Sequence, residues 1–158
     1  MMTLYHATST YKYTDDEVVI ASGPTTYYPN AVAALELTKP IEHPSRSICL
    51  FATEDPELAV GYLAGQRVEQ ADMRLYEVSM DDYHRAPFAL IHRISKRLDG
   101  HLLVTPLLNE YWKPLMKWNF YEVFSHQMKV VREVAIPQNN QVVFKIKYQA
   151  DFDQANNM

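Results

Sequence analysis

The sequence of 158 residues is poor in the features that mark secreted, membrane-spanning and nucleotide-loop proteins. Its one cysteine, Cys49, excludes an internal disulfide and is typical of a protein of the reducing cytosol. Its four glycines have the wrong spacing for a G-x-G-x-x-G fingerprint or a P-loop. No run approaches the roughly 18 apolar residues of a membrane-spanning helix, and the first residues lack the regions of a signal peptide. We therefore expect a cytoplasmic protein that does not span a membrane.

Patterns for metal binding and for a cysteine nucleophile are missing as well. His84, His92 and His101 lie close together in the sequence, but no H-x-x-x-H motif or Cys/His cluster accompanies them. Cys49 lies in a short apolar run, which is typical of an inert buried thiol. We expect no metal site.

The composition favours one globular domain. Apolar residues make up 47% and charged residues 22% of the chain, which is enough for one sizeable core. Fifteen Lys and Arg against nineteen Asp and Glu give a net charge of −4, which argues against a nucleic-acid partner without excluding a local basic groove. We expect a single domain over residues 1–149, followed by a polar tail over residues 150–158 that frays.

Hydrophobic periodicity predicts an α+β fold with a mostly antiparallel sheet and flanking helices. Strands are expected at about residues 3–8, 47–52, 73–78, 119–125, 128–136 and 141–148. In the last of these, Val142, Phe144, Ile146 and Tyr148 are expected to face one way, and Lys145 and Lys147 the other. Helices are expected at 31–37, where Asn30 can act as N-cap, after Thr53 or Asp55, and at 88–98 and 102–112.

Three segments, in order, resemble the characteristic blocks of the ADP-ribosyltransferase superfamily. Residues 4–9, Leu-Tyr-His-Ala-Thr-Ser, are similar to the family's strand ending in His-Gly-Thr or His-Gly-Ser. Residues 45–53, Ser-Arg-Ser-Ile-Cys-Leu-Phe-Ala-Thr, and the helix after them resemble the tyrosine-phenylalanine strand and helix of poly(ADP-ribose) polymerases and rifampin ADP-ribosyltransferases. The Ser-Arg start is also similar to a bacterial and phage subgroup of such domains. Residues 120–130, Phe-Tyr-Glu-Val-Phe-Ser-His-Gln-Met-Lys-Val, resemble the block that carries the catalytic glutamate.

The resemblance implies a split antiparallel sheet and a reaction on NAD, in which the bond between nicotinamide and ribose is cleaved with oxocarbenium character. It implies that Glu122 is catalytic, bonding the nicotinamide-ribose 2′-hydroxyl and stabilising the developing positive charge. His6 would bond the adenosine ribose hydroxyls, and the backbone of Ala7 would bond the nicotinamide carboxamide. Tyr62 would stack on the nicotinamide ring, and Arg46 would contact the pyrophosphate. Thr8 and Phe51 belong to the same NAD-binding blocks.

Three departures from the family pattern bear on these roles. Ala7 replaces the glycine after the histidine, and its methyl group narrows the nicotinamide slot. Leu50 stands where the family has a tyrosine, so the histidine-tyrosine-glutamate triad is incomplete. Phe120 replaces the Glu or Gln of arginine-specific members, which argues against arginine as the acceptor.

Each site residue also has a purely structural interpretation. His6 can be a hydrogen-bonded strand-end histidine, Tyr62 a core residue and Glu122 an outward-facing strand carboxylate. Arg46 can pair at the surface with Glu42 or Glu54.

Two functional hypotheses follow. In the first, the chain is a mono-ADP-ribosyltransferase that uses NAD as donor and a protein, nucleic acid or small molecule as acceptor. In the second, it is an inactive module of the same fold that binds ADP-ribose, an ADP-ribosylated target or a partner protein. If the three motifs match by chance, His6, Tyr62 and Glu122 should not meet at one cleft.

Overall fold

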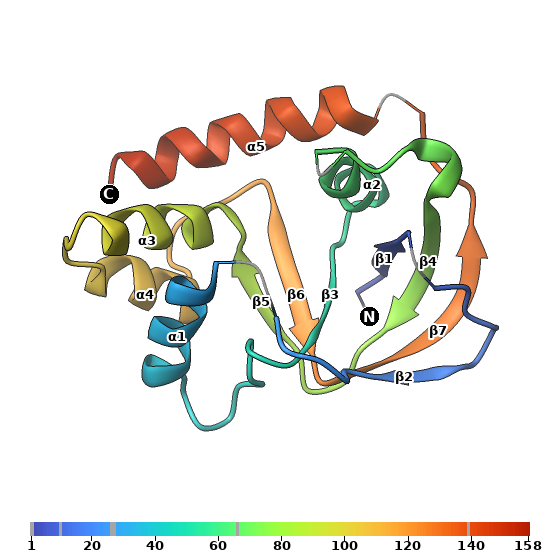
Figure 1. Ribbon diagram of the computed structural model, residues 1–158, viewed down its shortest axis with the longest axis horizontal. Helices are drawn as coiled ribbons and strands as arrows, with labels where there is room; N and C mark the ends of the chain where they lie inside the picture. Colours follow the sequence, from blue (N-terminus) through green and yellow to red (C-terminus); the bar gives the residue numbers. More distant parts are fainter. Residues whose placement is uncertain (1, 10, 26–27, 66, 139) are drawn as a thin grey trace.

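The computed structural model describes residues 2–9, 11–25, 28–65, 67–138 and 140–158, of which residues 62, 65 and 140–144 are described by their backbone alone. Two antiparallel sheets are flanked by helices, which confirms the predicted α+β class (Figure 1). No helix in these ranges is long and apolar enough to cross a membrane.

The two sheets meet through their first strands. The larger sheet has the order β1-β4-β7-β2 and consists of β1 (Leu4–Thr8), β4 (Arg74–Ser79), β7 (Gln127–Val134) and β2 (Val18–Ile20). The smaller sheet has the order β3-β6-β5 and consists of β3 (Leu50–Ala52), β6 (Tyr121–Ser125) and β5 (His84–Pro87). Tyr5 of β1 and Thr53, just after β3, exchange two backbone hydrogen bonds of 2.8 and 2.9 Å. This bridge joins the edge strands of the two sheets.

The helices cover the sheets unequally. They are α1 (Pro29–Thr38), α2 (Pro56–Gly65), α3 (Ala89–Asp99), α4 (Thr105–Trp112), α5 (Asn140–Asn156) and the short 3-10 helix η1 (Gln70–Asp72). Figure 1 shows α1, α3 and α4 grouped beside the smaller sheet, and α5 running along α3 and α2. The largest core cluster lies under the first group and includes Leu35, Ile91, Ile94, Leu108, Trp112 and Phe124.

The predicted cap of α2 is confirmed, and that of α1 is wrong. Asp55 Oδ1 accepts a hydrogen bond of 2.9 Å from the backbone N–H of Glu57, which satisfies one free donor of the first turn of α2. In α1, Tyr28 occupies the N-cap position with a left-handed φ of 52°. Asn30 lies inside the helix, and its side chain contacts Ser95 and Asp99, so that it ties α1 to α3.

The C-terminal prediction is also wrong. Residues 141–148, expected as a strand, belong to α5, and residues 150–156, expected to fray, continue the same helix. Asp151 and Ala155, one turn apart, are 2% and 0% exposed. Because residues four apart share one face of a helix, the tail contributes a buried stripe to the fold.

Candidate functional site

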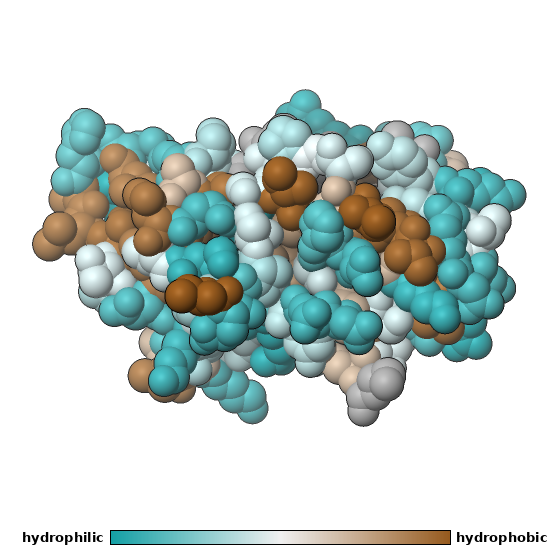
Figure 2. Space-filling model, turned by 90° about the horizontal axis from the view of Figure 1, so that it is seen from below, coloured by the Kyte–Doolittle hydropathy of each residue, from teal (hydrophilic) through white to brown (hydrophobic). Residues whose placement is uncertain are grey.

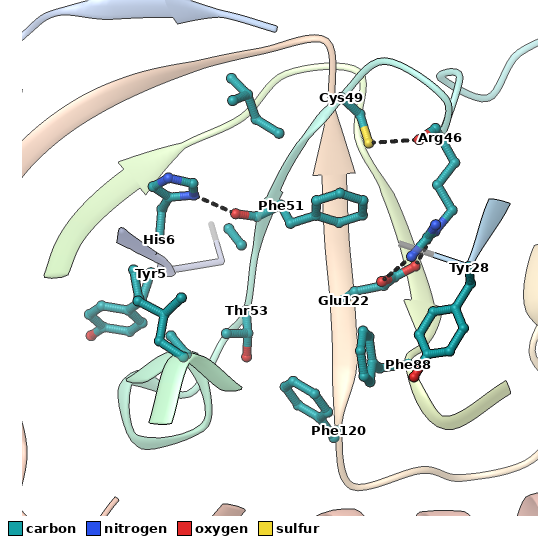
Figure 3. Close-up of a pocket in the computed structure, with 15 residues that line it drawn as sticks. Tyr5, His6, Tyr28, Arg46, Cys49, Phe51, Thr53, Phe88, Phe120 and Glu122 are labelled. Atoms are coloured by element: carbon teal, nitrogen blue, oxygen red, sulfur yellow. Dashed lines mark hydrogen bonds and ion pairs between the residues drawn. The ribbon is translucent and has the colours of Figure 1, made fainter. Parts of the chain in front are cut away.

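A cavity of about 250 Å³ lies where β1, β3 and β6 approach each other (Figure 3). The strands, α2 and the loops before α1 and β3 all contribute to its wall. Most of the wall is apolar or aromatic, including Phe51, Phe88 and Phe120. Such a wall suits a flat ring and leaves specificity to a few polar groups.

All three segments singled out in the sequence contribute residues to this wall. His6 and Ala7 of β1, Arg46 and Phe51 of the second block, and Glu122 of β6 all line this cavity. His6 and Glu122 therefore line the same cavity. A chance match of the motifs predicts that they would not. Thr8 is buried at the end of β1, next to the lining residue Ala7.

The side chain of Tyr62 lies outside the described residues, so its predicted stacking role stays a prediction. Its backbone belongs to α2, whose Ala59 and Leu63 line the cavity. Leu50, at the position of the missing family tyrosine, is half-buried and lines the cavity too.

A hydrogen bond to β3 fixes which ring nitrogen of His6 carries the hydrogen. Its Nδ1 lies 2.6 Å from the carbonyl oxygen of Phe51, and because a carbonyl only accepts, Nδ1 carries the hydrogen. Burial lowers the pKa of His6 from its ordinary value of 6.5, although the hydrogen bond to Phe51 opposes the shift. The neutral ring leaves Nε2 as an acceptor, which suits a hydroxyl donor such as a ribose.

Arg46 and Glu122 form a buried ion pair in the cavity wall. Arg46 Nε lies 2.8 Å from Glu122 Oε1, and Arg46 Nη2 lies 3.1 Å from Glu122 Oε2, a two-point fork. The side chains are only 2% and 4% exposed. Burial alone would lower the pKa of Arg46, but the Glu122 carboxylate outweighs it and raises that pKa further above its already high value.

This pair corrects two structural interpretations. Glu122 is not an outward-facing strand carboxylate, because it is 4% exposed. Arg46 is not paired at the surface, because it is buried against Glu122, while Glu54 pairs with Arg85. A contact between Arg46 and a pyrophosphate would require this ion pair to open or to share its donors.

One nitrogen of the Arg46 guanidinium has no hydrogen-bond acceptor among the described residues. This nitrogen, Nη1, is buried. An unsatisfied buried donor costs about 1–3 kcal/mol, and more when it carries charge. The site therefore tolerates a cost at the cavity wall, as functional sites commonly do.

Tyr111 of α4 is a site residue that the sequence analysis missed. Its hydroxyl donates a hydrogen bond to Glu122 Oε1, and the tyrosine is fully buried. Burial, followed by the nearby Glu122 carboxylate, raises the pKa of Tyr111 well above 10, so the hydroxyl stays a donor. The only sequence signal was its place at the end of an apolar stripe, which predicts a core residue.

The helix α1 holds the loop before β3 in place at Arg46 through the side chain of Glu36. Glu36 Oε1 accepts hydrogen bonds of 2.7 and 3.1 Å from the backbone N–H groups of Arg46 and Ser47. The thiol of Cys49 donates to the Arg46 carbonyl over 3.3 Å. Burial raises the pKa of Cys49 to about 12, so it stays protonated, in keeping with an inert thiol.

The approach to β6 is fixed from the other side by α5. Asp151 accepts hydrogen bonds of 2.9 and 2.7 Å from the backbone N–H groups of Asn119 and Phe120, just before the strand that carries Glu122. Burial raises the pKa of Asp151, and these bonds partly offset that shift. Helices at opposite ends of the chain thus set the positions of Arg46 and Glu122.

The three histidines noted in the sequence do not meet. His84 bonds the carbonyl oxygen of Tyr111 over 3.1 Å, and His92 bonds the hydroxyl of Tyr28 over 3.2 Å. Among the described residues, no group of three or more His, Cys, Asp or Glu side chains is arranged to hold a metal ion.

No protein-family model and no curated protein matches this chain.

Proposed function

We propose that the chain is an NAD-dependent mono-ADP-ribosyltransferase, which transfers ADP-ribose to a protein, nucleic-acid or small-molecule acceptor. The observation that carries the proposal is the convergence of His6, Phe51 and Glu122, from three distant segments, on one cavity. The two-sheet arrangement supports it, since the resemblance implies a split antiparallel sheet.

The cavity chemistry fits a nucleotide sugar as substrate. In the proposed reaction the bond between ribose C1′ and the nicotinamide nitrogen breaks, and the electron pair leaves with nicotinamide. The acceptor then forms a bond to C1′ and loses a proton. Glu122 would stabilise the positive charge that develops on the ribose, and the aromatic wall would hold the nicotinamide ring. A cavity of about 250 Å³, lined by both His6 and Glu122, has room for the nicotinamide riboside half of NAD.

The composition supports a cytoplasmic setting for this reaction, because the chain has a single cysteine. The donor is NAD, no metal is required, and the net charge of −4 makes nucleic acid the least favoured acceptor.

Nicotinamide release from NAD by the purified protein tests the proposal. Glu122→Gln alone is a poor control, because it leaves Arg46 charged and buried without its counter-ion. We therefore compare it with Arg46→Met/Glu122→Gln, which removes both charges, and check folding by circular dichroism. The wild type should release nicotinamide and both variants should not. Release by the folded double variant at the wild-type rate would overturn the proposal.

A second function is favoured by one observation, that the Glu122 carboxylate accepts hydrogen bonds from both Arg46 and Tyr111 in this structure. A carboxylate engaged in this way suits an inactive module that binds ADP-ribose or an ADP-ribosylated target. Calorimetric binding of ADP-ribose by a wild type that releases no nicotinamide, even with cell extract supplied as acceptor, would support this function over the enzyme.

A further inference from the structure

The two oxygens of Glu122 have unequal hydrogen bonding. Oε1 accepts from Arg46 Nε and from the hydroxyl of Tyr111, whereas Oε2 accepts from Arg46 Nη2. A carboxylate oxygen offers about two acceptor positions. Oε1 is therefore saturated, and Oε2 keeps one position for a further donor.

Tyr111 is itself held rigidly. Its ring stacks on Phe124 of β6, with centroids 6.3 Å apart and an interplanar angle of 24°. Its carbonyl oxygen accepts from His84 Nε2 on β5, over 3.1 Å. Two strands of the smaller sheet thus fix the tyrosine, which in turn fixes one oxygen of Glu122.

We propose that Tyr111 is a positioning residue, which with Arg46 occupies Oε1 of Glu122 and directs Oε2 to accept the hydroxyl of a substrate ribose. This inference rests on the proposed function. Tyr111 does not belong to the described lining of the cavity, whereas Glu122 does, so the tyrosine acts through the glutamate. Arg46 holds both oxygens and fixes the plane of the carboxylate, while Tyr111 distinguishes one oxygen from the other.

The geometry predicts an effect on turnover more than on binding. Without the Tyr111 hydroxyl, Oε1 loses one of its two donors, and the carboxylate no longer keeps Oε2 aimed at the ribose. A misaligned carboxylate stabilises the positive charge of the transition state less, while the binding of NAD itself changes little.

Tyr111→Phe is the test, and Tyr76→Phe is its matched control. Tyr76 is equally buried, and its hydroxyl accepts a hydrogen bond of 3.0 Å from the backbone N–H of Tyr13, on the larger sheet and outside the described cavity lining. Tyr111→Phe should lower kcat for nicotinamide release about 10- to 100-fold, the range for a hydrogen bond to a charged group, with KM within about twofold. Tyr76→Phe should keep the wild-type kcat.

A spectroscopic readout separates positioning from general destabilisation. The carboxyl-carbon NMR signal of Glu122, assigned by its loss in Arg46→Met/Glu122→Gln, should shift in Tyr111→Phe and stay in place in Tyr76→Phe. If Tyr111→Phe does not fold, Arg46→Lys takes its place, because lysine keeps the charge but lacks the fork that holds both oxygens. It should likewise lower kcat and move the signal.

The failures of the two proposals look different. An active wild type with an unchanged kcat in Tyr111→Phe overturns the positioning role and leaves the transferase proposal standing. A wild type that releases no nicotinamide overturns both. A drop in kcat of the same size in Tyr76→Phe would show that the loss is not specific to Glu122 and would also overturn the inference.

Discussion

Two of the arginine–glutamate pairs, one at each sheet, lie in opposite environments. Arg46 and Glu122, at the smaller sheet, are 2% and 4% exposed, whereas Arg74 and Glu133, on β4 and β7 of the larger sheet, are 40% and 44% exposed. The nitrogen–oxygen distances are similar, at 2.8 and 3.2 Å. Contact distance therefore does not distinguish the pairs, and burial does.

The difference indicates where the fold accepts an energetic cost. Removing two charges from water costs several kcal/mol per ion, and their mutual attraction repays this only when the remaining polar atoms are satisfied. The exposed pair incurs little of this cost and contributes little. A costly pair beside a cavity is more readily explained by binding or chemistry than by stability, which is why the proposed site is placed at the smaller sheet.

Exposed apolar side chains do not distinguish the two sheets, because Val18 and Ile20 on β2 of the larger sheet are exposed as well. The helical side next to the smaller sheet exposes apolar side chains at several positions, among them Leu37, Ile41, Leu102, Leu103 and Leu115. Figure 2 shows brown apolar side chains gathered at the left of the view and in smaller groups elsewhere on this face, with hydrophilic ones between the groups. Exposed apolar side chains are common on protein surfaces.

The largest expected effect comes from breaking the buried pair. Arg46→Met and Glu122→Gln should each lower the free energy of unfolding by about 3–5 kcal/mol, because each leaves the other charge buried without its counter-ion. The double variant Arg46→Met/Glu122→Gln should be more stable than either single variant. Urea denaturation of the four proteins measures this coupling. Additive losses in the double variant would show that the charges do not depend on one another.

A smaller effect is expected from the contact that holds β6 from α5. Asp151→Ala leaves the backbone N–H groups of Asn119 and Phe120 without their acceptor and should lower the free energy of unfolding by about 1–3 kcal/mol. Asp153→Ala on the same helix is the control, since Asp153 is exposed and should change stability by no more than about 0.5 kcal/mol. Equal losses in the two variants would contradict a specific role of Asp151.

Stability should depend on pH through His6, which lies on β1 of the larger sheet and bonds Phe51 on β3 of the smaller sheet. Burial lowers the pKa of His6 below 6.5 in the folded protein, so the unfolded chain binds more protons in the window just below that pH. Stability is then full above about pH 6.5 and falls as the pH drops through the window. His6→Gln should flatten this decline in melting temperatures measured from pH 8 to pH 5.

The decline should not vanish in His6→Gln, because burial also lowers the pKa of His84 and His92. His126→Gln, at an exposed histidine, is the matched variant. A decline in His6→Gln as steep as in the wild type would show that His6 does not contribute.

The smallest effect is expected at the exposed pair. Arg74→Met and Glu133→Gln should each change the free energy of unfolding by less than about 1 kcal/mol, because water already solvates both charges. Urea denaturation in low and high salt measures the change. A loss as large as at Arg46 would remove the contrast between the two sheets.

Local patterns in the sequence predicted most elements, and the exceptions have physical causes. The strand β5 was missed because it has four residues, includes polar ones and ends in Pro87, all of which an edge strand tolerates. The helix α5 was mistaken for a strand because Val142, Phe144, Ile146 and Tyr148 occupy every second position, with Lys145 and Lys147 between the last three. The helical stripe Tyr148, Asp151, Phe152 and Ala155 was also present, but a polar composition obscured it.

The candidate site was predictable only as separate pieces. The strands that carry His6 and Glu122 follow from alternation, and their functional interest came from a family resemblance. The pairing of Arg46 with Glu122 spans 76 residues, and no local pattern encodes it. Tyr111 resembles any other core residue of α4, because periodicity shows that a side chain is buried and not what its hydroxyl bonds.

The position of Asp151 in the chain has a consequence for synthesis. The ribosome makes this residue after every residue that lines the cavity. Until it emerges, the backbone amides of Asn119 and Phe120 lack the acceptor that they have in the folded protein. The strand that carries Glu122 is thus secured late, and a nascent chain that stops short of α5 holds the residues of the cavity without the contact that fixes them.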